Sequence, residues 1–481
     1  MKKIFLLSLL FILTKSYGQN CNCNESLHYV ENLIEKNSPS YINDVIDLHK
    51  EKKYQQFKNG LDKKSLQLNI SDSFSCMSLI SQYFSFFRDE HIQMNYKDSF
   101  WGNLDFDDTL ATKIFFKKYP FVNNYTIPNK VDNKSIVGYW QSEDGRNKFL
   151  IVPDTSAVRE YAGIVLNGDS LFWSKNQIMF EFTQKGNNEY RCTRWVSSRQ
   201  PRTYTAQLND SILVIARTHK FLRVKDANHE IPRQMLAYGG AFSFKELSPS
   251  TNYIRIPTFY ESHDIIDSII NVNKALIESK PNLIIDIRDN GGGSDDSYAP
   301  LLPYIYNTKK VSSPYTMSFY ATKHNNEGFE NAVRKNGYFK RDSTKFLDMF
   351  KEHRQNEGNF MQPHFSSIAI DTIFEYPKRV AIITNSGDAS SAEGFVMVAK
   401  ESSKVTTYGE NTGGCFNYGN IIMTSVPCLP IVIGVPTSKV FFVHPEYKNL
   451  EDIGFKPDVS LIQYKSDKWI DVVKEKMEFK K

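Results

Sequence analysis

The segment from 380 to 395, VAIITNSGDASSAEGF, constrains the fold of this chain more than any other stretch. It begins with an apolar, β-branched run, passes through the small and polar residues 385–388 and continues as Ser-Ser-Ala-Glu into a helix-compatible sequence. This order predicts a buried strand, a tight turn and a helix. A serine in such a turn lies at the helix N-terminus, where free backbone N–H groups can stabilise an oxyanion. The alternative is that Ser390 or Ser391 only caps the helix, with Glu393 completing a capping box.

The length and composition of the chain indicate a globular protein of several parts. A chain of 481 residues is too long for one ordinary core, so about two or three domains are expected. Hydrophobic residues make up 41% of the sequence and charged residues 23%, and an aromatic share of 14% favours β-rich regions. The formal net charge of +5 falls to +2 without Lys2, Lys3 and Lys15 of the expected leader. This balance gives no indication of a nucleic-acid partner.

Residues 1–18 have the three parts of a secretory signal peptide: a positive start, an apolar run from Ile4 to Leu13 and small residues before the cleavage point. The apolar run is too short to span a bilayer in the mature protein. Asn20 precedes Cys21, so the small residue of a lipid-attachment pattern is missing. The sequence predicts a periplasmic or secreted protein with no integral membrane segment in the mature chain.

All six cysteines lie after this leader, and an even number in an exported chain allows up to three disulfides. Cys415 and Cys428 flank a candidate hairpin and are the first predicted pair. Cys21 or Cys23 with Cys76 is the second. A zinc site at Cys21 and Cys23 is the rival interpretation, but their spacing is unusual and no nearby Cys/His pair completes a site. No metal and no other cofactor is expected.

Three regions of different periodicity follow the leader. Residues 19–130 have apolar residues at helical spacing and are expected to form a helical N-terminal segment carrying His91. Residues 135–225 alternate between apolar and polar positions and contain regular turns, which predicts an antiparallel β-barrel or sandwich with aromatic residues in its core. Residues 235–470 alternate strands and helices, which predicts an α/β domain with a mixed, partly parallel sheet. Its Lys/Asn-rich stretch 323–359 is expected to be a solvated insertion.

The α/β region contains four short motifs that resemble one family. DIRDNGGGS at 286–294 is similar to the glycine loop of the C-terminal processing (tail-specific) peptidases and the tricorn core protease. Ser-Ser-Ala-Glu at 390–393 resembles their nucleophile motif, with the reactive serine three residues before the glutamate. The segments 408–414 and 454–458 resemble the family's Gly-Glu-x-Thr-x-Gly and its closing Gly-x-x-Pro-Asp. The order and spacing of the motifs agree from 240 to 470.

One departure from the family pattern selects a branch. The place of the lysine base of the processing peptidases is held by Cys415 here. The tricorn branch instead uses Ser/His/Glu, and Asp-Glu-His-Ile at 89–92 looks like its histidine motif, while Glu451 occupies the place of its acid. Asp452 and Glu446 are the alternatives to that acid.

The resemblance and the chemistry of the residues together give a catalytic hypothesis. Ser390 is the expected nucleophile and forms an acyl-enzyme, His91 acts as general base and then as acid, and Glu451 orients the imidazole. The backbone N–H of Ser391, with that of Gly291 or Gly292, is expected to bind the oxyanion. Glycine suits the second position because a substrate that approaches closely leaves no room for a Cβ atom. Glu410 is expected to be structural. The chain is thus expected to be an exported serine endopeptidase acting on peptides or proteins.

Two other classes of function compete with this hypothesis. A non-catalytic ligand- or peptide-binding protein on the same fold would not need the Ser/His/Glu set. An adhesin or inhibitor would use the β-rich domain, with the α/β part as a scaffold. No carboxylate-binding loop of a PDZ module is apparent, so recognition of substrate C-termini is not predicted.

Overall fold

The computed structural model describes residues 22–479 except 69–71, 103, 106, 123, 127–133, 144, 146, 167–171, 217–218, 230, 232–240, 336–342, 364–366 and 452. The predicted leader, Cys21 and Asp452 therefore lie outside the described residues. Within the described ranges, no helix is long and apolar enough to cross a membrane.

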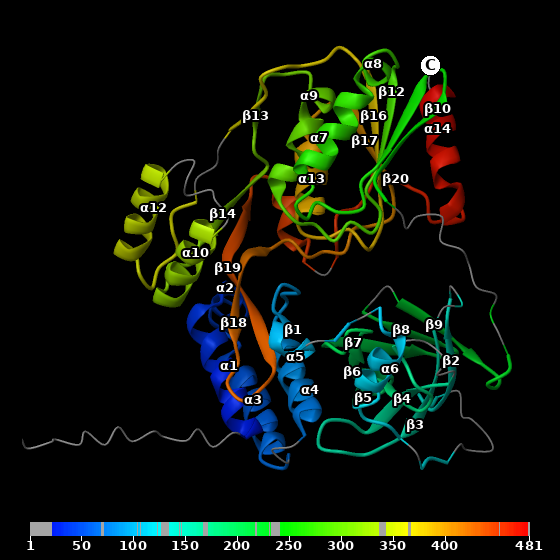
Figure 1. Cartoon of the computed structure of the whole chain (residues 1–481), viewed down its shortest axis with the longest axis vertical. Coiled ribbons are helices and arrows are strands. Elements are labelled where there is room, and N and C mark those ends of the chain that lie inside the picture. The colour runs from blue at the N-terminus through cyan, green and yellow to red at the C-terminus, as the bar shows by residue number, and fades with distance from the viewer. Residues whose placement is uncertain are drawn as a thin grey trace, which may run out of the picture.

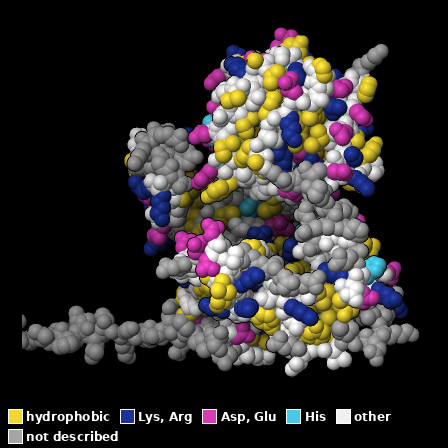
Figure 2. All heavy atoms as spheres, turned by 45° about the vertical axis from the view of Figure 1, so that its right-hand side comes forward, with side chains coloured by type: hydrophobic (Ala, Val, Ile, Leu, Met, Phe, Trp, Pro, Cys, Tyr) yellow, Lys and Arg dark blue, Asp and Glu magenta, His cyan; other side chains and the backbone are white. Residues whose placement is uncertain are grey.

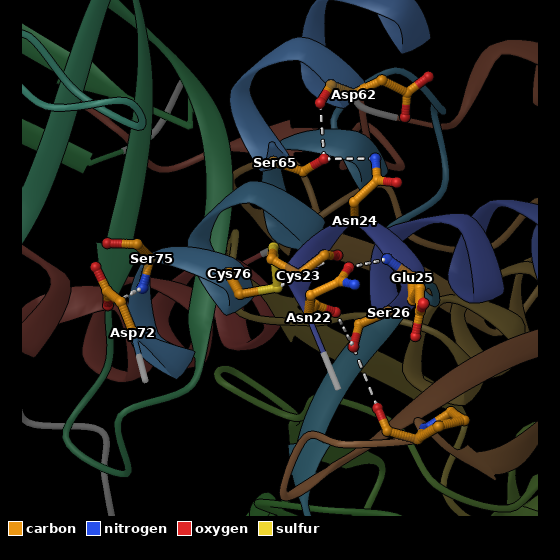
Figure 3. Close-up of a disulfide and its surroundings, with 11 residues drawn as sticks. Asn22, Cys23, Asn24, Glu25, Ser26, Asp62, Ser65, Asp72, Ser75 and Cys76 are labelled. Atoms are coloured by element: carbon orange, nitrogen blue, oxygen red, sulfur yellow. Dashed lines mark hydrogen bonds between the residues drawn. A yellow bond between two sulfur atoms is a disulfide. The ribbon is translucent and has the colours of Figure 1, made fainter. Parts of the chain in front are cut away.

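The N-terminal segment is helical, as predicted. Its main helices are α1 (Cys23–Asn37), α2 (Pro39–Tyr41), α3 (Glu51–Ser65) and α4 (Ser73–Phe84), with a π-helical turn at Ile42–Asp47. Asn22 caps α1 by accepting a hydrogen bond from the Glu25 N–H, and Asp72 caps α4 in the same way through the Ser75 N–H. A disulfide between Cys23 and Cys76 joins the starts of these two helices (Figure 3).

The cysteine pairing confirms one prediction and corrects the other. Cys23 pairs with Cys76, as the second prediction allowed. The predicted Cys415–Cys428 pair is wrong, because Cys415 is a free, buried thiol. Cys428 is itself disulfide-bonded. The candidate hairpin does exist, as β18 (Tyr418–Ser425) and β19 (Ile431–Phe442), but Cys415 precedes it and turns inward.

A short strand after α4 ties the helical segment to the C-terminal part of the chain. Strand β1 (Gln93–Tyr96) pairs antiparallel with β19, which also pairs with β18 and β14 (Tyr315–Phe319). Strands β18 and β19 run from the α/β domain down to the N-terminal helices (Figure 1). The short helices α5 (Asp98–Trp101) and α6 (Thr109–Phe116) then lead to the barrel.

The middle region is a closed eight-stranded antiparallel barrel, which confirms the predicted barrel or sandwich. Its strands are β2 (Gly138–Ser142), β3 (Lys148–Pro153), β4 (Tyr161–Val165), β5 (Ile178–Gly186), β6 (Glu189–Trp195), β7 (Pro201–Asn209), β8 (Ile212–Ile215) and β9 (His219–Val224). Buried aromatic side chains fill the interior, among them Trp140, Phe149, Phe180 and Phe182. The barrel is therefore a packed core.

The C-terminal region is an α/β domain with a six-stranded mixed sheet, as predicted. The strand order is β10 (Ser243–Ser248), β11 (Thr251–Arg255), β12 (Asn282–Asp286), β16 (Arg379–Thr384), β17 (Val405–Gly409), β20 (Val459–Ser460), and only β10 is antiparallel to its neighbour. One face is covered by α7 (His263–Val272), α8 (Lys274–Ile277), α9 (Leu302–Ile305) and α13 (Ser391–Lys400), and the other by α14 (Trp469–Phe479) (Figure 1). Burial on both faces explains why β12 and β16 have continuous apolar sequences.

The Lys/Asn-rich stretch is more ordered than a solvated insertion. It contains the helices α10 (Lys323–Lys335) and α12 (Ser343–Gln355), and it is flanked by the strand pair β13 (Lys310–Ser312) and β15 (Ser367–Ala369). The Asn325 amide is buried and donates to the Asn37 carbonyl at 2.9 Å. The insertion thus contacts the N-terminal helical segment.

Candidate active site

Ser390 lies in the turn between β16 and α13, at the carboxyl edge of the parallel strands. Its backbone has φ 56° and ψ −125°, a conformation that non-glycine residues rarely adopt. Its N–H donates to the Cys415 carbonyl at 2.9 Å, and its side chain makes no capping hydrogen bond to α13. The structure therefore does not support a simple helix cap at this position. A strained turn that leaves a serine hydroxyl available is typical of a nucleophile site.

The imidazole of His91 lies beside the Ser390 hydroxyl, although 299 residues separate the two in sequence. The distance from His91 Nε2 to Ser390 Oγ is 3.4 Å. His91 is in the segment between α4 and β1, and two residues later β1 joins β19 with Gln93 opposite Gly434. This strand pairing fixes the histidine over the α/β domain. The imidazole is buried, and because burial penalises the imidazolium, the pKa of His91 is lowered to about 4.

Two groups face the other nitrogen of the His91 ring. Cys415 Sγ lies 3.4 Å from Nδ1, and Asp89 Oδ1 lies 3.8 Å from it. The same Asp89 oxygen accepts the His91 backbone N–H at 3.0 Å. Burial raises the pKa of the Asp89 carboxyl to about 7. Asp89 was not among the predicted site residues, although it lies within the predicted histidine motif.

Glu451 is buried under the segment that carries Cys415. Its Oε2 accepts the N–H groups of Asn417 at 2.9 Å and Phe416 at 3.3 Å. Its carbonyl accepts a hydrogen bond from the Arg88 guanidinium at 3.3 Å. Glu451 thus holds the backbone of Phe416 and Asn417 and, through its carbonyl, the side chain of Arg88. Of its predicted alternatives, Glu446 lies in the short 3₁₀ helix Pro445–Asn449.

The glycine loop after β12 lies directly against the serine turn. Gly292 has φ +93°, and a Cβ atom there would be 2.6 Å from the Ala389 carbonyl oxygen and 2.9 Å from the Ser391 nitrogen. Its N–H donates to Asn290 Oδ1 at 2.9 Å. No hydrogen bond in the described part of the chain uses the N–H of Gly291 or of Ser391. These two amides remain for an oxyanion.

Glu393 has a role that the sequence analysis missed. Its carboxylate is fully buried and accepts hydrogen bonds from Thr412 Oγ1 at 2.5 Å, Cys415 N at 2.8 Å and Gly414 N at 3.0 Å. It therefore fixes the loop that places Cys415 beside His91. The sequence feature that could have indicated this role is that Glu393 is the only acidic residue in the mainly apolar segment of α13. Glu410, expected to be structural, accepts hydrogen bonds from Ser386 N and Oγ at 3.3 Å.

Within the described residues, no group of three side chains that could hold a metal ion occurs at this site. One set of three candidate ligands occurs elsewhere, in the N-terminal helices: His28, Glu31 and Asp62, with ligand atoms within 4.8 Å of one another. The Lys58 ammonium lies 3.4 Å from Glu31 Oε2, where a cation would otherwise bind. This set is not part of the Ser390 site.

A hollow separates the α/β domain from the lower half of the molecule (Figure 2).

The comparisons with known proteins agree with the motifs. Residues 250–461 match the model of peptidase family S41. A search of curated proteins found no match. Several solved structures are distantly similar. Mature CPAF complexed with lactacystin has 12% identity, coverage of 95% of this chain and 98% of that chain, and a TM-score of 0.47. The photosystem II D1 C-terminal processing protease has 12% identity, coverage of 92% and 93%, and a TM-score of 0.37. A Parabacteroides merdae protein has 19% identity, coverage of 51% of this chain and 66% of that chain, and a TM-score of 0.35.

Proposed function

The chain carries a serine-type peptidase domain of family S41, and on this premise we propose that it is an exported endopeptidase that forms an acyl-enzyme on Ser390. The observation that carries the proposal is the 3.4 Å separation of His91 Nε2 and Ser390 Oγ. A neutral hydroxyl needs a base within hydrogen-bond reach, and such contacts are often long before substrate binds. The lowered pKa of His91 keeps its ring neutral and able to accept the proton at neutral pH.

The proposed reaction uses the Ser390 hydroxyl, the His91 imidazole and two backbone N–H groups. Ser390 Oγ attacks the peptide carbonyl while its proton passes to His91 Nε2, which then donates it to the leaving amine. The N–H groups of Ser391 and Gly291 would hold the developing oxyanion. Gly292, the other predicted donor, is the weaker candidate because its N–H already donates to Asn290. Water then hydrolyses the acyl-enzyme with His91 as base.

We propose that Glu451 orients His91 indirectly, by holding the backbone segment next to Cys415. Its carboxylate supports the backbone next to Cys415, which contacts the ring. Asp89 is the second candidate, because its carboxylate lies 3.8 Å from Nδ1. Comparison of kcat/KM for Glu451→Gln and Asp89→Asn decides between them. The orienting acid gives the larger loss, and a loss below twofold in both would exclude this role for either.

Substitution of the nucleophile tests the proposal directly. We expect Ser390→Ala to abolish peptide hydrolysis and fluorophosphonate labelling, with a thermal midpoint close to that of the wild type. Ser391→Ala is the matched control, because its hydroxyl donates to the Gly293 carbonyl and only its backbone N–H is assigned to the reaction. Peptidase activity that survives in Ser390→Ala would refute the assignment. A wild-type protein that is never labelled would favour a non-catalytic binding protein.

Export is supported by the expected leader and by the Cys23–Cys76 disulfide, since such bonds persist in oxidising compartments. Mass spectrometry of the N-terminus of the protein made in its own cells tests it. A mature chain that begins near Gln19 is expected, and a chain that still begins at Met1 would contradict export.

A further inference from the structure

A cavity of about 540 Å³ lies between the N-terminal helices and the outer side of the barrel. One wall is formed by α3, the end of α4 and the segment that follows it. Strands β6 and β7 form the opposite wall. Asp89, Glu90 and Ile92 line the cavity, so it borders the segment that holds His91. His91 itself contacts Ser390, so the cavity and the serine turn lie on either side of this one segment.

The walls of this cavity carry more cations than anions. The cationic side chains are Lys50, Lys53, Arg88, Lys185, Arg191 and Arg202, and the acidic ones are Asp89, Glu90 and Glu189. The cations come from α3, from the segment after α4 and from the barrel strands, so they surround the space. No ion pair in the described part of the chain involves Lys53, Lys185 or Arg191. Arg191 instead donates to the neutral Gln82 amide at 3.0 Å.

Cations of the barrel strands and of α3 repel one another across the cavity. The pKa of Lys185 is lowered to about 8, first by burial and then by the charges of Arg191 and Lys64. Glu189 acts in the opposite direction, and Lys53 adds a smaller lowering effect. The pKa of Lys64 is lowered for the same reasons, by burial and by Arg191, while Glu160 acts in the opposite direction. An anion in the cavity would relieve this repulsion and stabilise the charged form of the lysines.

We propose that this cavity binds an acidic segment of the polypeptide substrate, through several carboxylates, next to the catalytic residues. The proposal rests on the proposed peptidase function, because that function supplies a polypeptide ligand. The cations are spread over both walls of the cavity, which suits several carboxylates better than one terminal carboxylate, because a single carboxylate would be held by one compact cluster of donors. Aromatic side chains such as Phe57 and Tyr204 line the same space and can contact the apolar parts of the segment.

Binding to an inactive variant tests this without depending on catalysis. The probes are three fluorescein-labelled peptides: one with several Asp residues and an amidated end, its Asn counterpart with the same end, and the Asn peptide with a free carboxylate. With Ser390→Ala protein, fluorescence anisotropy should show the Asp peptide binding about tenfold more tightly than its amidated Asn counterpart. This preference should shrink at high salt, because salt screens the attraction between the carboxylates of the peptide and the cations that line the cavity.

The variant Lys53→Gln/Lys185→Gln, in the Ser390→Ala background, should lose most of this preference. The control Lys220→Gln/Lys310→Gln removes the same charge from exposed positions away from the cavity and should keep it. Equal binding of the Asp and amidated Asn peptides, or an equal loss in both double variants, would overturn the proposal. Tight binding of only the free-carboxylate peptide would also overturn it, in favour of chain-end recognition. Absence of hydrolysis and of labelling in the wild type would refute only the proposed peptidase function.

Discussion

At the scale of single residues, the serine turn depends on backbone positions as much as on side chains. Ser390 adopts φ 56° because its N–H is held by the Cys415 carbonyl and its carbonyl accepts the N–H groups of Glu393 and Gly394. These bonds fix the first turn of α13 below the hydroxyl. Gly292 then packs so closely against the turn that no side chain fits. The geometry of the nucleophile is thus set by two loops together.

Substitution by alanine should reduce kcat/KM much more at Gly292 than at the adjacent Gly291. Gly292→Ala would place a Cβ atom 2.6 Å from the Ala389 carbonyl oxygen at a positive φ, so we expect kcat/KM to fall by at least about tenfold. Gly291→Ala keeps the N–H and its Cβ atom meets no protein atom within 4 Å, so only a clash with bound substrate should lower its activity, and its loss in kcat/KM should be smaller than that of Gly292→Ala. Peptide hydrolysis measures both.

Gly291→Pro completes this series. Proline removes the N–H assigned to the oxyanion, so the variant should lose about a hundredfold in kcat. If Gly291→Pro were as active as Gly291→Ala, the oxyanion assignment would be wrong. A thermal midpoint for each variant shows whether the loop has kept its fold.

The buried His91 should extend activity to acidic pH. A general base must be neutral, and the lowered pKa of His91, about 4, keeps the ring neutral down to that pH. An unperturbed histidine would be about nine-tenths protonated at pH 5.5. The Asp89 carboxyl, whose pKa is raised to about 7, titrates in the same range, so the test uses the variant Asp89→Asn. In this variant we expect kcat/KM at pH 5.5 to stay within about twofold of its value at pH 7.5. The pH profile of kcat/KM is measured with a peptide substrate that has no titratable groups. The rate of fluorophosphonate labelling at the same pH values serves as a control. An acidic limb centred near the ordinary histidine value would contradict the burial argument.

At the scale of elements, the pairing of β1 with β19 brings His91 to Ser390. Periodicity could indicate the helical segment, the alternating β region and the α/β region, because each depends on local sequence. It could not indicate β1, since four residues carry little pattern and their partner lies in a distant strand. The roles of Asp89 and Glu393 were missed for a related reason. Their contacts exist only once the segments have packed.

Crowding the β1–β19 pair should reduce catalysis without touching a reacting group. A Cβ atom at Gly434 would lie 2.8 Å from Ile421 Cγ2 and 3.3 Å from Gln93 Cγ. Gly434→Val should therefore displace β1 and cost about 1–3 kcal/mol of stability. It should also lower kcat/KM more than tenfold, roughly, because His91 moves with the strand. Peptide hydrolysis and urea denaturation measure the two effects.

The control for this variant is Gly186→Val, at the end of β5, where an added Cβ atom meets nothing within 4 Å. It should leave both activity and stability nearly unchanged. Unaltered activity in a destabilised Gly434→Val protein would show that the strand pair does not position the histidine.

At the scale of the whole molecule, one hydrophobic core joins three parts of the chain. It contains residues of α1 and α4, of β19 and of the outer side of the barrel, such as Leu27, Ile80, Ile433 and Leu150. The barrel therefore supports the helices that carry His91, while its own interior is packed separately. The hollow between the halves stays open to solvent (Figure 2).

The Cys23–Cys76 disulfide should stabilise this assembly. It closes a loop across 53 positions, for which chain entropy predicts about 4 kcal/mol, and native bonds of this kind contribute about 2–5 kcal/mol. Cys23→Ala/Cys76→Ala should lower the thermal midpoint by several degrees, as differential scanning fluorimetry would show. The single variant Cys76→Ala should have the same thermal midpoint as the double variant, because both variants lack the Cys23–Cys76 bond. A midpoint equal to that of the wild type would contradict this role.

By itself, the sequence determined the order of helical, β-rich and α/β regions and the strand–turn–helix that presents Ser390, because these follow from periodicities within short windows. Family motifs added the candidate histidine. Only the tertiary structure decided that His91 lies 3.4 Å from Ser390, that Cys415 is a free thiol beside the ring and that Glu393 holds the loop below it. Such contacts join residues far apart in the chain, and the spacing of residues along a sequence does not encode the distances that packing creates.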